Sequence, residues 1–371
     1  MKQFNILMSL ALISLNCAPK KFFNSGPTLL QSISVFHRPE SVAFSLDGKY
    51  LFVGNCASDL FGADKSKVGF VKGAGVISRC KVNEKGNVKV EKLRFISGLN
   101  GPTGLKILRK ATDKYPVGTL LVNQGISLQV DKDGNSVTDI NRLGVGIDLY
   151  DPKDGKLLGR IPMGPGSAIA NSIGHVPLIL NSMAFDKSGN LYITDTAKGG
   201  DRLDPQLRQY PGMIRIKHSS IDNPNERDIS FIPIPGVPNG IGYWEKENAI
   251  MIVTMGGTEI PGGNAIYKIP ISSFPLDSIP EPLFDNVGTA DGIAFTPAGT
   301  IITSRFSGDL LSIPYNGKPS PIIMESFSAP ADHRLLTLED GNSILAVPEQ
   351  NRKDPNPWSQ KLKIIHLPKN F

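Results

Sequence analysis

The chain has 371 residues, of which 40% are hydrophobic, so it can bury a sizeable core in one large domain or two ordinary ones. The formal charge is +6, but Lys and Arg are scattered singly and form no basic stripe with interleaved aromatic residues, which argues against nucleic-acid binding. The 38 Gly and 29 Pro residues, with almost no helical periodicity, indicate many short strands joined by tight turns.

The first sixteen residues have the pattern of a targeting segment. Lys2 is a charged start, and residues 4–15 form an apolar core that is too short to span a bilayer. Cys17 follows, and a Cys at this place resembles the lipobox of bacterial lipoproteins, in which it is acylated and becomes the first residue. Asn16 departs from the small residue that usually precedes that Cys. An ordinary signal peptide cleaved nearby is the alternative.

Both interpretations predict an exported protein of the cell envelope or periplasm. Residues 1–17 would be the signal segment, 18–28 a tether and 29–371 the folded domain. The membrane would be contacted only through a lipid on Cys17.

A short pattern then recurs along the chain: a polar residue, an apolar strand, a turn and a second strand. It is clearest at residues 290–304, where Asp291 precedes a strand and a turn that ends at Gly299. The other copies begin at Glu40, Thr103, Asn181, Asn239 and Asp332. In three copies the polar residue precedes the turn glycine by eight positions, at 40→48, 181→189 and 291→299. Such self-similarity is typical of a repeat architecture.

Two further strands can be assigned after each of the first five copies. In chain order they are 75–82 and 89–97, 146–150 and 156–161, 212–217 and 228–234, 264–269 and 281–284, and 308–313 and 321–325. In the copy that begins at Thr103, the second strand is residues 118–123, after a longer turn. After the last copy only residues 361–367 remain, and residues 29–36 are the candidate for the missing strand. The prediction is an all-β fold, a six-bladed β-propeller whose last blade is closed by an N-terminal strand.

The copies start 63, 78, 58, 52 and 41 residues apart, whereas a bare blade needs about 40–50. The excess is expected in loops at residues 57–74, 124–145, 163–178, 197–211 and 350–360. The loop 163–178 leads into the strand of Asn181 and is placed to line or cover a site there. Residues 164–167 are not a phosphate loop, because no Gly-Lys-Ser/Thr follows and no helix is expected to begin there.

Cys56 and Cys80 are not expected to form a disulfide. Cys56 ends one predicted strand and Cys80 lies well along the next, which separates them by roughly 15 Å at ~3.3 Å per residue. A disulfide needs Cα atoms within about 7 Å.

The six polar starts converge in this fold, because the first strand of each blade lines the central channel. All six side chains carry oxygen, and none is Lys, Arg, His or Cys. Three carboxylates aimed at one place repel each other unless a proton or a cation neutralises them. Oxygen ligands suit Ca²⁺ or Mg²⁺ better than zinc. The alternative is structural: polar residues here can simply bond to neighbouring backbone groups in a wet channel.

Four of these starts resemble the inner-strand motifs of the gluconolactonase/regucalcin family. They are Pro39-Glu40-Ser41-Val42-Ala43-Phe44, Asn181-Ser182-Met183-Ala184-Phe185, Pro238-Asn239-Gly240-Ile241 and Ala290-Asp291-Gly292-Ile293-Ala294. The family belongs to a wider group of six-bladed calcium-dependent hydrolases that includes paraoxonases and diisopropyl fluorophosphatase.

The resemblance implies a divalent metal, most of all Ca²⁺, with Glu40, Asn239 and Asp291 as ligands. Asn181 would be a fourth ligand or a substrate contact. Asp291 would also be the catalytic general base or nucleophile, and Thr103 and Asp332 would face the substrate. The implied function is an exported metal-dependent hydrolase of lactones, esters or related small molecules.

The sequence departs from the family at Ile179, where gluconolactonases have an Arg that grips the sugar hydroxyls. This favours an apolar ester, lactone or organophosphate over a sugar lactone. No counterpart of the paraoxonase channel His is found: alternation turns His333 away from the channel if Asp332 faces in, and His37 and His175 are expected at the surface or in loops.

Two other functions remain as alternatives. One is a non-catalytic, lipid-anchored envelope propeller that binds a protein or glycan partner and holds a structural ion. The other is a quinone-cofactor dehydrogenase, which is disfavoured because the channel starts supply no basic residue to hold an anionic cofactor.

Overall fold

The computed structural model describes residues 26–371 except 62–66, 125–128, 134, 136, 138–143, 197–210, 257–261, 275–279, 323–325, 352–355 and 357. The expected signal segment with Cys17 and most of the tether lie outside the described residues. Within the described ranges, no helix is both long and apolar enough to cross a membrane.

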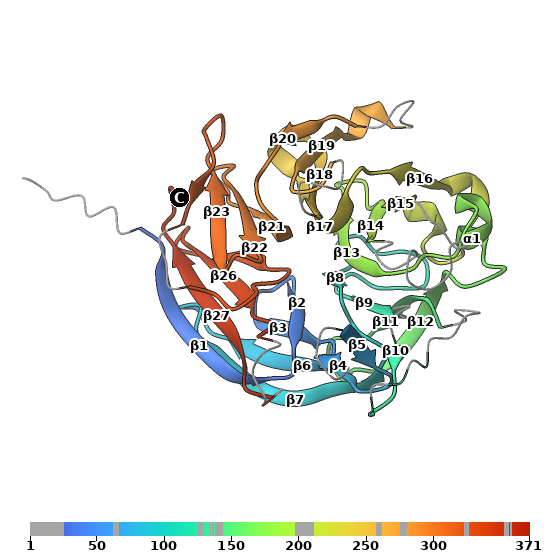
Figure 1. Cartoon of the computed structure of the whole chain (residues 1–371), viewed down its shortest axis with the longest axis horizontal. Coiled ribbons are helices and arrows are strands. Elements are labelled where there is room, and N and C mark those ends of the chain that lie inside the picture. The colour runs from blue at the N-terminus through green and yellow to red at the C-terminus, as the bar shows by residue number, and fades with distance from the viewer. Residues whose placement is uncertain are drawn as a thin grey trace, which may run out of the picture.

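Six antiparallel four-stranded sheets surround a central axis, which confirms the predicted six-bladed propeller (Figure 1). The first blade contains β2 (Pro39–Phe44), β3 (Tyr50–Asn55), β6 (Gly75–Val82) and β7 (Val88–Leu99). The second contains β8 (Leu105–Ile107), β9 (Leu120–Gln124), β11 (Gly146–Tyr150) and β12 (Leu157–Pro162). The third contains β13 (Leu180–Phe185), β14 (Leu191–Asp195), β15 (Gly212–Ile216) and β16 (Ile229–Pro233).

The fourth blade contains β17 (Val237–Trp244), β18 (Ala249–Met255), β19 (Ile266–Pro270) and β20 (Pro282–Phe284). The fifth contains β21 (Ala290–Phe295), β22 (Ile301–Arg305), β23 (Asp309–Ile313) and β24 (Ser320–Pro321). The sixth contains β25 (Arg334–Thr337), β26 (Ser343–Pro348), β27 (Gln360–Leu367) and β1 (Thr28–Phe36). β1 pairs antiparallel with β27, so the N-terminal strand closes the last blade as predicted.

The eight-residue spacing between polar residue and glycine reflects one inner strand followed by a tight turn. Gly48, Gly189 and Gly299 have φ of 68°, 89° and 93°, in the left-handed region that glycine occupies without a Cβ penalty. In the first of these turns the amide of Gly48 donates to the carbonyl of Ser45 at 3.0 Å. In these three blades the repeated glycine therefore marks the hairpin between the first and second strands.

The core is divided into six apolar clusters, each between two neighbouring blades. Between the first and second blades, for example, Phe52 and Ile77 pack with Leu105 and Leu120. Corresponding clusters fill the other five blade interfaces. Because the middle strands of every blade are covered on both faces, they are almost wholly apolar.

The long loops of the first two blades hold an additional sheet, so the expectation of plain loops at 57–74 and 124–145 was wrong. β4 (Ser58–Phe61) pairs antiparallel with β5 (Lys67–Val71), and β5 pairs parallel with β10 (Gln129–Val130). A seventh apolar cluster joins this sheet to the start of the third blade; it consists of Cys56, Phe70, Leu178 and Ile179.

A short helix, α1 (Ala168–Ile173), begins where no helix was expected. Ser167 caps it by accepting from the amide of Ala170 at 3.1 Å, and Gly174 ends it with φ of 80°. The hydroxyl of Ser172 lies 3.2 Å from the carbonyl of Ile229, so the helix leans on the outer strand β16. The expected role of the 163–178 loop in lining or covering a site near Asn181 stays a prediction. Single 3₁₀ turns are η2 (His218–Ser220), η3 (Glu226–Asp228), η4 (Glu245–Glu247) and η5 (Ile271–Ser273).

Cys56 and Cys80 are buried and are not joined by a disulfide, as the sequence led us to expect. Cys80 pairs with Leu51 across β3 and β6, whereas Cys56 lies beyond the other end of β3. Burial, with a smaller effect of Glu91, raises the pKa of the Cys80 thiol to about 12.

Candidate functional site

Each of the four expected metal ligands lies at a β-bulge in the first strand of its blade. In β21, Ala290 pairs with Arg305 and Ile293 with Thr303, so Asp291 and Gly292 are accommodated opposite one residue. The same one-residue slip occurs at Glu40, at Asn181 and at Asn239. A bulge turns a side chain out of the regular alternation and is frequent next to active sites. The repeated bulge gives four oxygen-bearing residues an equivalent position.

Backbone contacts between neighbouring blades bring these positions together. A Cβ on Gly240 would lie 2.2 Å from the carbonyl oxygen of Asp291, so only glycine permits this approach of the fourth and fifth blades. A Cβ on Gly292 would lie 2.8 Å from the Cα of Asp332. The amide of Asp332 in turn donates to the carbonyl of Glu40 at 2.9 Å.

The remaining blade starts complete the ring through side-chain to backbone bonds. Thr194 donates to the carbonyl of Asn239 at 2.5 Å, which joins the third and fourth blades. Asn123 donates to the carbonyl of Asn181 at 2.9 Å, which joins the second and third. A Cβ on Gly54 would lie 3.0 Å from the carbonyl of Pro102, between the first and second. We call the four residues Glu40, Asn181, Asn239 and Asp291 the oxygen ring.

The oxygen ring offers donors that fit a hard divalent cation. The side chains are buried: Asn239 is 1% and Asp291 2% exposed. The Oδ1 atoms of Asn181 and Asn239 accept no hydrogen bond from any described residue. An unpartnered buried amide oxygen is costly unless something binds to it. No group of three His, Cys, Asp or Glu side chains suited to a metal occurs in the described part of the chain, so amide oxygens must complete any such site.

Thr103 and Asp332 differ from the oxygen ring in their bonding. The hydroxyl of Thr103 donates to the carbonyl of Leu180 at 2.6 Å, which is the structural role that was the alternative for a blade start. Asp332 is fully buried and forms a forked ion pair with Arg334. It also accepts from Ser182 of the third blade at 2.8 Å. Their predicted contact with substrate stays a prediction.

Three polar residues near the ring were missed from the sequence. Asn123 in β9 has a buried Oδ1 with no hydrogen-bond partner in the described part of the chain. Arg334 and Lys106 lie deeper in two inner strands than the blade starts. Burial, with the positive charges of Arg334 and Arg109, holds the pKa of Lys106 well below its usual range. The inner strands therefore carry basic side chains, although the six blade starts do not.

His333 and His175 lie close to their expected places, and a buried carboxylate is found beside His175. His333 is fully buried between blades, its Nε2 lies 3.1 Å from the carbonyl of Ile302, and burial lowers its pKa to about 4. His175 lies 3.9 Å from the buried carboxylate of Asp195. Asp195 also accepts from the amide of Ile179 at 3.0 Å, so this carboxylate fixes the chain just before Asn181.

Ile179, the position of the family's sugar-binding Arg, is only 8% exposed. Its side chain packs in the cluster with Leu178, Cys56 and Phe70, under the additional sheet. A buried apolar side chain thus stands at the position where the sequence resemblance led us to look for an Arg.

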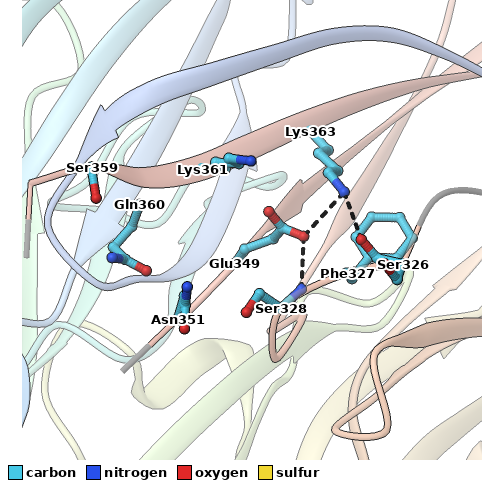
Figure 2. A pocket seen from close by; sticks show the side chains of 9 residues that line it. All are labelled: Ser326, Phe327, Ser328, Glu349, Asn351, Ser359, Gln360, Lys361 and Lys363. Carbon is cyan, nitrogen blue, oxygen red and sulfur yellow. Dashed lines mark hydrogen bonds and ion pairs between the residues drawn. The ribbon is translucent and has the colours of Figure 1, made fainter. Parts of the chain in front are cut away.

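A separate cavity of about 200 Å³ lies at the edge of the last blade (Figure 2). Figure 2 shows the ammonium of Lys363 pointing toward Glu349 and Ser326; it lies 3.3 Å from the carboxylate and donates to the carbonyl at 3.0 Å. The two charged side chains are only 6% and 3% exposed. The amide of Ser328 donates to the same Glu349 oxygen at 2.9 Å. These groups satisfy each other, which fits a structural ion pair.

Comparisons with solved structures give many matches to this fold. A gluconolactonase from Xanthomonas campestris matches with a TM-score of 0.54 and 12% identity, over 92% of this chain and 95% of that chain. A luciferin-regenerating enzyme matches with a TM-score of 0.55 and 11% identity, over 92% and 95%. The PQQ-bound aldose sugar dehydrogenase from Streptomyces coelicolor matches with a TM-score of 0.54 and 13% identity, over 92% and 97%.

The chain has a gluconolactonase-like propeller fold. No protein-family model and no curated protein matches the sequence. At identities of 11–13% the likeness establishes the fold and leaves the activity to be argued from the site.

Proposed function

We propose that the chain is an exported, metal-dependent hydrolase of small lactones or esters. A divalent ion, in the first place Ca²⁺, would be held by Glu40, Asn181, Asn239 and Asp291. The observation that supports this most is the pair of buried amide oxygens, on Asn181 and Asn239, that accept no hydrogen bond from the described residues. They occupy the same bulge position as the two carboxylates.

A divalent ion at this place would supply Lewis acidity, which polarises a carbonyl or phosphoryl oxygen. The protein's own contribution is positional. Asp291 is buried beside the amide residues and can take a proton from an attacking water or attack the substrate directly. Gly240 and Gly292 fix the backbone on either side of Asp291, so that its carboxylate is held in one place.

The expected substrate class is inferred from the surroundings of Ile179. With Ile179 buried among Leu178, Phe70 and Cys56, no cation is placed to bind sugar hydroxyls at that position. We therefore expect apolar esters, lactones or organophosphates to be better substrates than a sugar lactone.

The test is calcium titration calorimetry on residues 18–371, with a panel of aryl esters, aliphatic lactones, an organophosphate and gluconolactone assayed alongside. Asp291→Ala is compared with Asp113→Ala, a control carboxylate on an exposed loop. We expect calcium binding and calcium-dependent turnover in the wild type and the control, and neither in Asp291→Ala. No calcium binding in the wild type would reject the metal site.

Two other results would select other functions. Calcium binding without turnover of any substrate would favour the non-catalytic, lipid-anchored envelope propeller that binds a protein or glycan. Reduction of a dye with an aldose and added quinone cofactor would favour the dehydrogenase. Arg334 and Lys106 lie in inner strands, so the chain does supply basic groups of the kind that an anionic quinone cofactor would need.

Export and lipidation are proposed from the sequence. We expect the mature protein of a bacterial host to begin at an acylated Cys17 and to fractionate with membranes. Cys17→Ser should release it into the soluble fraction. An intact mass showing an unmodified N-terminus near residue 18 would support the ordinary signal peptide instead.

A further inference from the structure

Arg334 spans the channel. The third and sixth blades are opposite each other in a six-bladed ring, yet Arg334 of β25 donates to the hydroxyl of Ser182 in β13 at 3.1 Å. It also donates to the carbonyl of its neighbour His333 at 2.8 Å and to the carboxylate of Asp332 at 2.7 Å. The guanidinium therefore lies on the channel axis, next to the oxygen ring, since Ser182 follows Asn181.

One donor of this guanidinium is unused. The side chain of Arg334 is only 11% exposed, and its Nε is buried and has no hydrogen-bond partner in the described part of the chain. A buried N–H without an acceptor is destabilising, and more so when the group is charged. The Nε–H of Arg334 therefore needs a hydrogen-bond acceptor that the described side chains do not provide.

Lys106 adds positive charge close enough to Arg334 for the two side chains to interact electrostatically. It lies in β8, the inner strand of the second blade, and remains partly exposed. The charges of Arg334 and Arg109 lower its pKa, whereas Asp332 opposes them. Lys106 thus feels two positive side chains and the carboxylate of Asp332, which Arg334 already engages with a fork.

We propose that the channel contains an anion-binding subsite, formed by Arg334 and Lys106, that takes a small oxyanion such as a carboxylate or phosphate group. The oxyanion accepts from the free N–H of Arg334 and pairs with the Lys106 ammonium. Oxyanions suit the site because they have several acceptor oxygens and a charge that relieves the repulsion among the basic groups. The subsite does not require the metal, so it is independent of the proposed hydrolase.

The test is calorimetric titration of sodium phosphate and sodium acetate, at low ionic strength and in chelator, on residues 18–371. Lys106→Met is the main variant, because no hydrogen bond or ion pair of its ammonium supports the described structure. Lys153→Met, on an exposed turn, is the matched control. We expect binding of at least one anion, a tenfold or greater loss in Lys106→Met and no change in the control. Phosphate without acetate, or the reverse, identifies which oxyanion the subsite takes.

A second measurement does not depend on a folded variant. Lys106 is labelled in the native protein by reductive methylation, with and without the anion, and quantified by mass spectrometry. We expect several-fold protection of Lys106 by the bound anion and none of Lys153. Absence of heat with both anions, or equal binding by Lys106→Met, would overturn the proposal and leave only water at Arg334. The phosphate and acetate titrations are repeated on Asp291→Ala, which lacks a proposed metal ligand. Anion binding that persists in this variant shows that the anion subsite does not depend on the metal site.

Discussion

Replacing Asn239 with Leu should have opposite effects on stability with and without metal. The side chain is 1% exposed, and its Oδ1 has no hydrogen-bond partner in the described part of the chain. In chelator, an apolar side chain of similar size removes an unpartnered buried acceptor. The variant should then be as stable as the wild type or more stable, by up to about 1–3 kcal/mol.

In calcium the order should reverse. A wild-type protein at a free calcium concentration 100 times its Kd gains about 2.7 kcal/mol of unfolding free energy. Loss of one of four ligands that weakens binding tenfold removes about 1.4 kcal/mol of this gain, and stronger weakening removes nearly all of it. The assay is urea unfolding followed by fluorescence, in chelator and in excess calcium.

The matched control is Asn190→Leu. Asn190 donates to Asp186 at 2.8 Å and accepts from the amide of His218 at 3.0 Å, so both ends of its amide are used. This control should be destabilised equally in both media. If Asn239→Leu is also destabilised equally in chelator and in calcium, the Oδ1 of Asn239 is not a metal ligand. The hypothesis that the oxygen ring binds a metal is then wrong.

Three further predictions concern the blades around the site. Glu349→Gln leaves the Lys363 ammonium buried without its counter-charge and should cost about 3–5 kcal/mol in urea unfolding; a cost below about 1 kcal/mol would mean that the pair is solvated. Cys80 should resist iodoacetamide at pH 8 in the native protein and react after unfolding, because its pKa is raised to about 12; rapid native labelling would contradict its burial. Burial lowers the pKa of His333 to about 4 in the folded state. Its contribution to the free energy of unfolding is therefore complete above about pH 6.5 and is lost as the pH falls toward 4, a total loss of about 3 kcal/mol. His333→Asn should flatten that part of the stability–pH curve, and an unchanged slope would assign it to other groups.

The blades could be predicted from the sequence because their signals are local. An inner strand, a glycine in the left-handed region and a second strand recur within about fifteen residues, as at Asp291 to Ser304. The additional sheet gave no such signal. Its strands have two to five residues, and β5 pairs in parallel with β10, which is nearly sixty residues further along the chain. Pairing of that kind depends on tertiary packing, here through Phe70 and Ile179.

The positions of the candidate site were predictable for a related reason. A residue that opens an inner strand must reach the channel mouth, so Glu40, Asn181, Asn239 and Asp291 could be grouped without knowing any loop. The sequence did not show that Thr103 bonds to the backbone and that the Asn181 oxygen has no partner, because hydrogen bonds between blades depend on their spacing.

Arg334 and Lys106 also have a signal in the sequence, two and three residues after the blade starts. Two residues after the blade start, five copies have an apolar residue and the last has Arg334. Three residues after the start, four copies have Ala or Gly and the second has Lys106. An aligned repeat makes each exception visible, because equivalent positions in a propeller face equivalent surroundings. A charged residue at a position that is otherwise small or apolar breaks the symmetry of the fold. Such departures mark where one blade has acquired a role that the others do not share.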